Sequence, residues 1–187
     1  MALDSDANRE ILMRGFPALR NDPNFKIKSE ETPNYNCIAW AMGYNDRRMD
    51  PTSEGALFDW PKGLPKLCAL ALHISILVKA FEAEGFEITK NYHFEPDKEK
   101  VYLYKEIGKP LWTHASRLVA EGVEYSKFGK SFDAVHSSGT LTNIYGEVYA
   151  CMKRINIPHF QESGEKMEVD KKKEKELLEA LTKRGLI

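Results

Sequence analysis

The longest apolar stretch of the chain, residues 67–84 (LCALALHISILVKAFEAE), has the spacing of a helix. Its first half is apolar nearly all round, and its second half becomes amphipathic as Lys79, Glu82 and Glu84 enter the pattern. Gly85 follows, and glycine commonly ends a helix because it adopts the left-handed conformation without strain. We therefore expect one helix over residues 67–84, with its first half deep in the core.

Downstream of this stretch, apolar and polar positions alternate with a period of two, which is typical of half-buried strands. Turn-forming residues at positions 108–110 and 121–122 separate the later runs. This pattern predicts an antiparallel meander, and residues 141–155 predict a further strand or a short helix. The four strand runs of the meander are residues 86–89, 101–104, 111–119 and 123–128.

The chain upstream of residue 67 has shorter signals. Residues 5–15 predict a helix capped by Asp6, and residues 25–28 predict an edge strand. Residues 44–67 contain too many proline, glycine and asparagine residues for a long element, so we expect a loop. A loop of this length is usually functional or packed by its own aromatic side chains.

The last part of the chain is rich in charge. Residues 165–184 predict a helix whose apolar stripe consists of three leucines, with a lysine cluster that forms a solvated face. We therefore expect two parts: an α+β domain over residues 1–158 and a charged C-terminal helical tail over residues 159–187.

Composition narrows the class of protein. The chain has 187 residues, 42% hydrophobic and 29% charged, which are values of an ordinary globular domain with its own core. Its formal net charge of −1 argues against a nucleic-acid or membrane partner. No apolar run approaches the roughly 18 residues that a membrane span requires.

The three cysteines, Cys37, Cys68 and Cys151, lack metal-ligand spacing, and an odd number cannot pair fully in disulfides. They favour a reducing compartment. The N-terminus is acidic and has no leader-like apolar run. We therefore expect a cytoplasmic protein, or one exported by a route that needs no signal peptide.

Residues 32–43 (TPNYNCIAWAMG) combine folding signals with chemistry. Turn and cap residues precede Cys37, an apolar run follows it, and Gly43 predicts the helix end. A cysteine in the first turn of a helix lies where unpaired backbone N–H groups favour the thiolate. Cys37 is therefore a candidate nucleophile, with a small buried apolar residue as the alternative interpretation.

His114 lies in the third strand run, where alternation places it on one face with Trp112. A turn at residues 120–122 brings Ser126 diagonally beside it on the same face. Further along, Asp133 and His136 are candidates to orient the imidazole, because a catalytic histidine needs a partner on its second nitrogen. The alternative for His114 is a half-exposed strand residue without a catalytic role.

The order of these parts resembles that of papain-like cysteine hydrolases: a cysteine at a helix start, a core helix, and an antiparallel sheet carrying a histidine. Within that superfamily the chain resembles the small bacterial NlpC/P60 and CHAP amidases. It is closer still to an uncharacterised bacterial family that shares the motifs NCIAWAMG, THASRL, YSKFG, DAVH and YGEVYACMKR, over residues 33–154. The resemblance implies a papain-like α+β fold, with N-terminal helices packed on an antiparallel β-meander.

The resemblance also implies a mechanism. Cys37 attacks an amide carbonyl, His114 takes and returns the proton, and a polar residue orients the imidazole. Asp133 is the first choice for the orienting residue, with His136 and Ser126 as alternatives. The backbone N–H of Cys37 supplies one oxyanion donor. No metal or organic cofactor is required.

The expected function is thus a thiol hydrolase acting on a protein or peptide substrate, as a peptidase, amidase, deamidase or effector-type toxin. Its candidate substrate-binding residues are Trp40, Trp60 and Trp112. The alternative is a catalytically inactive protein-binding module of the same fold. Such a module holds a protein partner through the loop of Phe58 and Trp60 or through the C-terminal helix.

Overall fold

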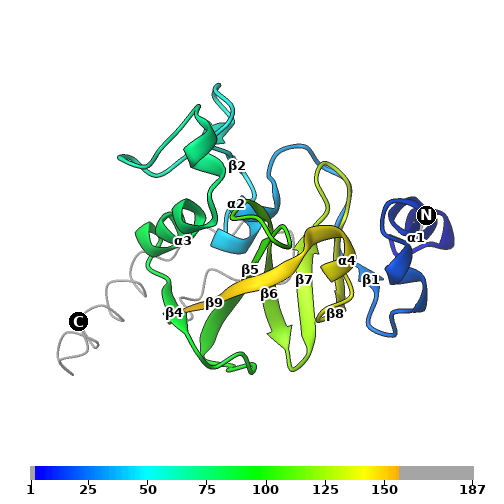
Figure 1. Ribbon diagram of the computed structural model, residues 1–187. Helices are drawn as coiled ribbons and strands as arrows, with labels where there is room; N and C mark the ends of the chain where they lie inside the picture. Colours follow the sequence, from blue (N-terminus) through cyan, green and yellow to red (C-terminus); the bar gives the residue numbers. More distant parts are fainter. Residues whose placement is uncertain (1–2, 156–187) are drawn as a thin grey trace, which may run out of the picture. The chain divides into compact units, whose positions relative to one another are not determined.

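The computed structural model describes residues 3–155. They form a mixed α and β fold with one sheet of seven strands (Figure 1). The helical tail expected over residues 159–187 lies outside the described residues. The helices are α1 (Asp6–Gly15), α2 (Cys37–Met42), α3 (Ile74–Ala83) and α4 (Thr142–Tyr145), with the 3-10 helices η1 (Pro17–Asn21) and η2 (Ala69–Leu72). The strands are β1 (Lys26–Ile27), β2 (Arg48–Met49), β3 (Phe58–Asp59), β4 (Glu87–Thr89), β5 (Lys98–Lys105), β6 (Trp112–Ala120), β7 (Val123–Lys127), β8 (Asp133–Ser137) and β9 (Glu147–Ile155).

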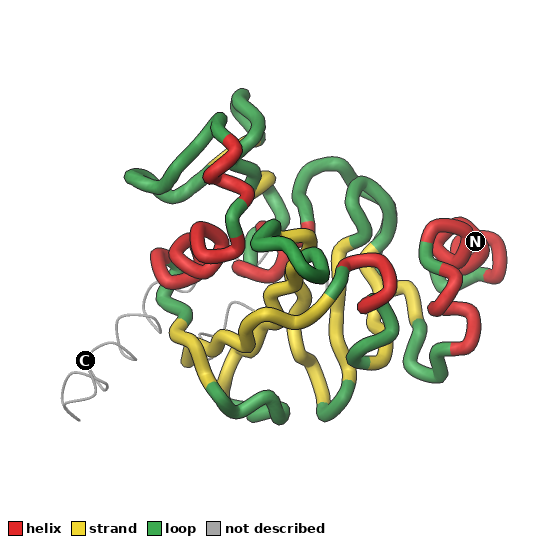
Figure 2. The backbone as a smooth tube through the Cα atoms, viewed as in Figure 1, coloured by secondary structure: helices red, strands yellow, loops and turns green. Residues whose placement is uncertain are grey.

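The sheet has the strand order β1-β8-β7-β6-β5-β9-β4, and all its neighbours are antiparallel (Figure 1). Figure 2 shows the strands in yellow and the helices in red. The predicted meander is confirmed for β5, β6 and β7, and β8, which lies outside the four predicted runs, extends it. The predicted edge strand is β1. The prediction was wrong for β4, because β9 lies between β4 and β5. The long β9 pairs with β5 along the whole of Lys98–Lys105, whereas β4 has only three residues with which to form a ladder. A separate parallel pair joins β2 and β3.

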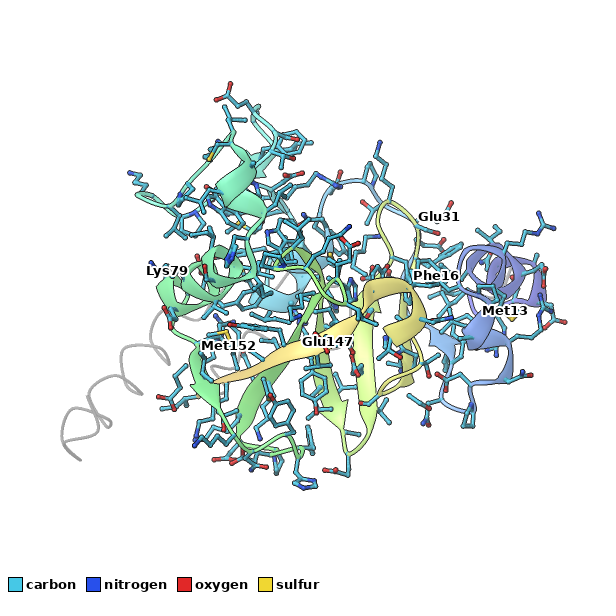
Figure 3. All side chains as sticks on the ribbon, in the orientation of Figure 1. Met13, Phe16, Glu31, Lys79, Glu147 and Met152 are labelled. Atoms are coloured by element: carbon cyan, nitrogen blue, oxygen red, sulfur yellow. The ribbon has the colours of Figure 1, made fainter. Side chains whose placement is uncertain are left out.

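Helices α2 and α3 cover one face of the sheet, which we call the helix face. Their apolar side chains form a core with the sheet residues of that face, and burial of these side chains supplies the main driving force for folding. Met152 of β9 lies on this side of the sheet (Figure 3). The sheet residues of this core are Val101, Leu103, Ala115, Ala150 and Met152.

The opposite face of β5 to β8 is buried but polar, and we call its side chains the polar layer. The register puts these residues on one face, because Tyr104 pairs with His114, Tyr102 with Ser116, and Glu124 with His136. Buried polar groups normally find hydrogen-bond partners, and a set of this size indicates an organised network. The polar layer consists of Tyr102, Tyr104, His114, Ser116, Glu124, Ser126 and His136.

The N-terminal part packs at the β1 end of the sheet (Figure 1). Its helix is confirmed, but the cap is Ser5, whose side chain accepts from Asn8 N, and Asp6 is the first helical residue. Leu12 and Leu19 join a second apolar cluster with strand and loop residues of this end. The apolar side chains at this end of the sheet are thereby buried.

The helix predicted over residues 67–84 is two elements. His73 has extended backbone, its Nδ1 accepts from Ser75 N at 3.2 Å, and α3 begins at Ile74. The backbone N–H of Ile74 donates to Pro110 O, so a tertiary contact interrupts the helical pattern. The expectation that the first half lies in the core was therefore wrong: Leu67 and Leu70 are more than half exposed.

Candidate functional site

Helix α2 forms as the residues around Cys37 predict. The side chain of Asn36 accepts a hydrogen bond from Ala39 N at 3.0 Å and caps the helix. Gly43 ends it in the left-handed conformation, with φ of 106°. The Asn36 side chain also donates to Met49 O and accepts from Met49 N. These two hydrogen bonds join the start of the helix to β2. Cys37 is the first helical residue and is half-buried.

Opposing influences act on the Cys37 thiol. Burial raises its pKa, because a thiolate is poorly solvated there. Backbone N–H groups of Ala115, Ile38 and Cys37 itself bond towards the sulfur and lower the pKa, as does the charge of Arg48. Burial is the larger influence, so the thiol is protonated at neutral pH. The sulfur nevertheless lies among backbone donors that would stabilise a negative charge.

An irregularity at the start of β6 decides where His114 faces. Tyr104 pairs with His114 and Lys105 pairs with Trp112, so Thr113 has no partner across the ladder. Such a bulge reverses the alternation on either side of it. Trp112 therefore packs against the helix-face core while His114 lies in the polar layer. The prediction that they share a face was wrong, because strict alternation ignores the extra residue.

His114 begins a chain of hydrogen bonds through the polar layer. Its Nε2 lies 3.0 Å from Ser126 Oγ, and the same Oγ lies 2.8 Å from His136 Nε2. His136 Nδ1 lies 3.0 Å from the carbonyl oxygen of Ser137. All three side chains of this chain are at most 1% exposed. The predicted position of Ser126 beside His114 is confirmed.

The direction of these bonds follows from their last member. The Ser137 carbonyl only accepts, so His136 Nδ1 carries a hydrogen, and in neutral imidazole Nε2 is then an acceptor. Ser126 donates its one hydrogen to that Nε2 and accepts from His114 Nε2–H. His114 Nδ1 is thereby left as the unprotonated nitrogen. Within residues 3–155 it makes no hydrogen bond.

Tyr145, at the end of α4, covers the other side of the imidazole. Its ring stacks on His114 with centroids 4.0 Å apart and planes 5° apart. Phe16 packs on Tyr145 from the N-terminal part, with ring centroids 5.7 Å apart. Burial lowers the pKa of His114 to about 3, and the neighbouring His136 acts in the same direction. His114 is therefore neutral at pH 7.

Sequence reasoning missed Tyr145 as part of the site. Burial raises the pKa of its hydroxyl, and the nearby Cys37 acts in the same direction, so Tyr145 is near both Cys37 and His114. Its only sequence signal was the following Gly146, which marks a sharp turn.

Cys37 and His114 approach each other through β6 but do not bond. The sulfur lies on the helix face at the N–H of Ala115, the residue after His114, whose ring lies in the polar layer. Pairing of β6 with β7 runs from Ala120 to Arg117, and in the described part of the chain the ladder goes no further. The sulfur and the imidazole both lie where these strands separate. No hydrogen bond joins them within residues 3–155.

Asp133 does not contact the imidazole. Its position opposite Lys127 in the β7 and β8 ladder turns it to the helix face, away from the polar layer. There it forms an ion pair with Lys127 at 3.3 Å and accepts from Tyr35 OH at 2.5 Å. The residue beside His114 is Ser126, with His136 behind it, and Asp133 instead anchors the segment that leads into α2.

The three tryptophans differ in their surroundings. Trp60 is 6% exposed and belongs to the helix-face core, so it is not a cleft wall. The guanidinium of Arg117 stacks on Trp40, 3.8 Å from the ring centroid, and Trp112 Nε1 donates to Ala71 O. Trp40 of α2 and Trp112 of β6 are both partly buried and pack against the helix-face core.

Two further properties concern residues 3–155 alone. They contain no group of three or more histidine, cysteine, aspartate or glutamate side chains arranged to hold a metal ion. None of their helices has the length and apolar character of a membrane span.

Comparison with known proteins gives one match. Residues 26–153 match the family model described as Domain of unknown function (DUF7689). The matched segment contains α2, the whole of the polar layer and most of β9. No curated protein and no solved structure matches the chain.

Proposed function

Because the chain belongs to the family Domain of unknown function (DUF7689), whose description gives no activity, we propose its function from the site: a thiol hydrolase that acts on an amide bond. The proposal includes a papain-like fold, in which a helix carries the nucleophile and an antiparallel sheet carries the histidine. Cys37 is the nucleophile and His114 the general base. The substrate is a protein or peptide, attacked as by a peptidase, amidase or deamidase.

One observation carries the proposal: the sulfur of Cys37 lies at the N–H of Ala115, directly beside His114, whose Nε2 is already engaged by Ser126. A catalytic imidazole needs one nitrogen held by a partner and the other free to accept a proton. The hydrogen-bond chain through Ser126 provides this arrangement. The unprotonated Nδ1 of His114 is the atom that would accept the proton of the Cys37 thiol.

The reaction follows general thiol chemistry. The Sγ–H proton passes to His114 Nδ1 as Sγ attacks the carbonyl carbon, and the C–N bond breaks when Nδ1 returns that proton to the leaving amine. Water then cleaves the thioester with the same imidazole as base. Backbone N–H groups of Cys37 and Ala115 lie at the sulfur, where they would donate to the developing oxyanion. The sulfur and Nδ1 must come within about 3 to 4 Å, and such contacts are often longer without substrate.

A second candidate function is the catalytically inactive binding module. The observation that favours it is the protonation state, because burial raises the pKa of Cys37 and lowers that of His114 to about 3. The two groups are then a neutral thiol and a neutral imidazole, and no thiolate–imidazolium pair forms at neutral pH. This candidate predicts a thiol no more reactive than its exposure dictates.

Acylation of the thiol by an activated ester separates these functions. Cys68 is exposed and reacts by itself, so the experiment uses the full-length Cys68→Ser chain. With p-nitrophenyl acetate we expect acetylation at Cys37, followed by release of acetate, measured by mass spectrometry and nitrophenol release. His114→Gln should slow acylation by about 100-fold, the lower range for general acid–base catalysis.

Three further variants make the result specific. Ser126→Ala should slow acylation by about tenfold, because His114 Nε2 loses its acceptor while the ring remains. Asp133→Asn should leave the rate within about twofold of the parent after correction for stability, since Asp133 does not contact the imidazole. Cys37→Ser should abolish the acetyl adduct. Acylation that is unchanged in a folded His114→Gln chain would reject the hydrolase and favour the binding module.

A further inference from the structure

Arg48 of β2 lies beside the start of α2. The Asn36 amide, which caps α2, bonds the backbone of Met49, and this contact brings the strand that carries Arg48 to the start of the helix. The Arg48 guanidinium donates to Pro33 O at 3.1 Å and lies over the ring of Phe58 at 5.9 Å. The cation is therefore held on the segment that leads into the helix.

Arg48 differs from most other arginines of residues 3–155 in having no carboxylate partner there. Its neighbour Arg47 pairs with both Asp46 and Asp59. Arg48 is half-buried, its one hydrogen-bond acceptor is a neutral carbonyl, and its remaining N–H groups are available. The other arginines that pair with a carboxylate are Arg9, Arg14, Arg20 and Arg154.

The charge of Arg48 reaches the reactive centre. It lowers the pKa of the Cys37 thiol and also acts on the ammonium of Lys127. Lys127 itself is neutralised by Asp133 and its side chain is fully buried, so it offers no site to a ligand. A planar guanidinium with free donors is the group that best matches a carboxylate.

We propose that Arg48 binds a carboxylate of the substrate, so that the amide attacked by Cys37 belongs to a carboxylate-bearing molecule. This inference rests on the proposed function and names its substrate class. The carboxylate is either an acidic side chain or the α-carboxylate next to the scissile bond. Arg48 is thus a specificity-determining residue.

Two alkylating reagents that differ in charge test the inference. Iodoacetate and iodoacetamide both lose iodide as Cys37 forms a carbon–sulfur bond, but only iodoacetate carries a carboxylate. In the full-length Cys68→Ser chain, Arg48→Gln should lower the ratio of the iodoacetate rate to the iodoacetamide rate by about fivefold, the scale of one charge near a protein surface. Salt should lower the parent ratio as well. Arg47→Gln is the matched control and should leave the ratio unchanged.

An unchanged ratio in the Arg48→Gln chain overturns the inference while the proposed function stands. If Cys37 reacts with neither reagent, the proposed function fails and the binding step is measured by itself. Glutarate should then shift the Nε–Hε NMR signal of Arg48 saturably, whereas neutral glutaramide should not. Absence of that shift also overturns the inference.

Discussion

The imidazole of His114 and the ring of Tyr145 stack face to face, with planes 5° apart. Tyr145 ends α4, and its carbonyl accepts from Thr113 Oγ1, the unpaired bulge residue of β6. The bulge that turns His114 into the polar layer is therefore joined to the residue that covers the imidazole. The orientation of His114 depends on a long-range contact, which can be tested by changing the ring.

Tyr145→Phe should keep the stack and change the free energy of unfolding by less than about 1 kcal/mol, because no hydrogen bond from the hydroxyl is present within residues 3–155. Tyr145→Leu should cost roughly 1 to 3 kcal/mol through lost stacking and packing. The NMR signals of the His114 ring report the stack directly. They should stay shifted by the aromatic ring in the phenylalanine variant and lose that shift in the leucine variant.

The pKa of His114 predicts a loss of stability in acid. Its folded-state pKa of about 3 lies below the ordinary histidine pKa of 6.5, so the unfolded chain binds the proton more tightly. The contribution is complete above pH 6.5 and falls as the pH drops towards 3. Between pH 7 and pH 5 this contribution lowers the free energy of unfolding by about 2 kcal/mol. Urea unfolding at the two pH values measures the total drop in this free energy. The drop should be about 2 kcal/mol larger in the parent chain than in the His114→Gln chain. Equal drops in the two chains would show that His114 is not held neutral.

Arg154 of β9 joins two helix ends. It donates to Met42 O at the end of α2 and to Glu84 O just after α3, and it pairs with Glu99 at 2.5 Å. Arg154→Met should destabilise the protein by about 3 to 5 kcal/mol, because the Glu99 carboxylate then stays buried without this cation.

Adding Glu99→Gln to Arg154→Met should recover part of that stability, since the buried charge is removed. Chemical denaturation of the parent, both single variants and the double variant gives the coupling between the two residues. A double variant as unstable as the sum of the single variants would contradict the ion-pair account.

Gly146 connects α4 to β9 with φ of 86°, and a Cβ there would collide with the carbonyl oxygen of Lys105. Gly146→Ala should therefore lower the free energy of unfolding by about 3 kcal/mol or more, because the backbone is strained and the Lys105 carbonyl must move. Gly108→Ala is the matched control: Gly108 also has positive φ, at 75°, but open space around it, so its cost should be near 1 kcal/mol. Thermal unfolding of the two variants distinguishes collision from conformational strain alone.

Local signals were sufficient for the helix that carries Cys37. Asn36 and Gly43 act on the backbone within a few residues, so their effect is visible in the sequence. The same holds for Ser126, which a tight turn brings beside His114. Both predictions depend only on the chain between the residues concerned.

Long-range contacts decided what local patterns could not. The apolar pattern of residues 67–84 favours one helix, but a hydrogen bond from Ile74 N to Pro110 O starts α3 there. Asp133 was the first choice to orient His114, yet its pairing with Lys127 turns it to the helix face. The start of α3 depends on a contact between distant residues, and the direction of Asp133 depends on the register of the β7 and β8 hairpin and on its bond to the distant Tyr35.

By itself, the sequence determined a capped helix with Cys37 at its start, an antiparallel meander, and a serine next to His114, because each follows from spacing along the chain. Only the tertiary structure decided that β9 enters the sheet beside β5, that Asp133 binds Lys127 and Tyr35, and that His114 faces away from Trp112. The physical reason is the period of two in a strand: one unpaired residue, Thr113, reverses the face of every residue on one side of it, and no local pattern reveals that residue.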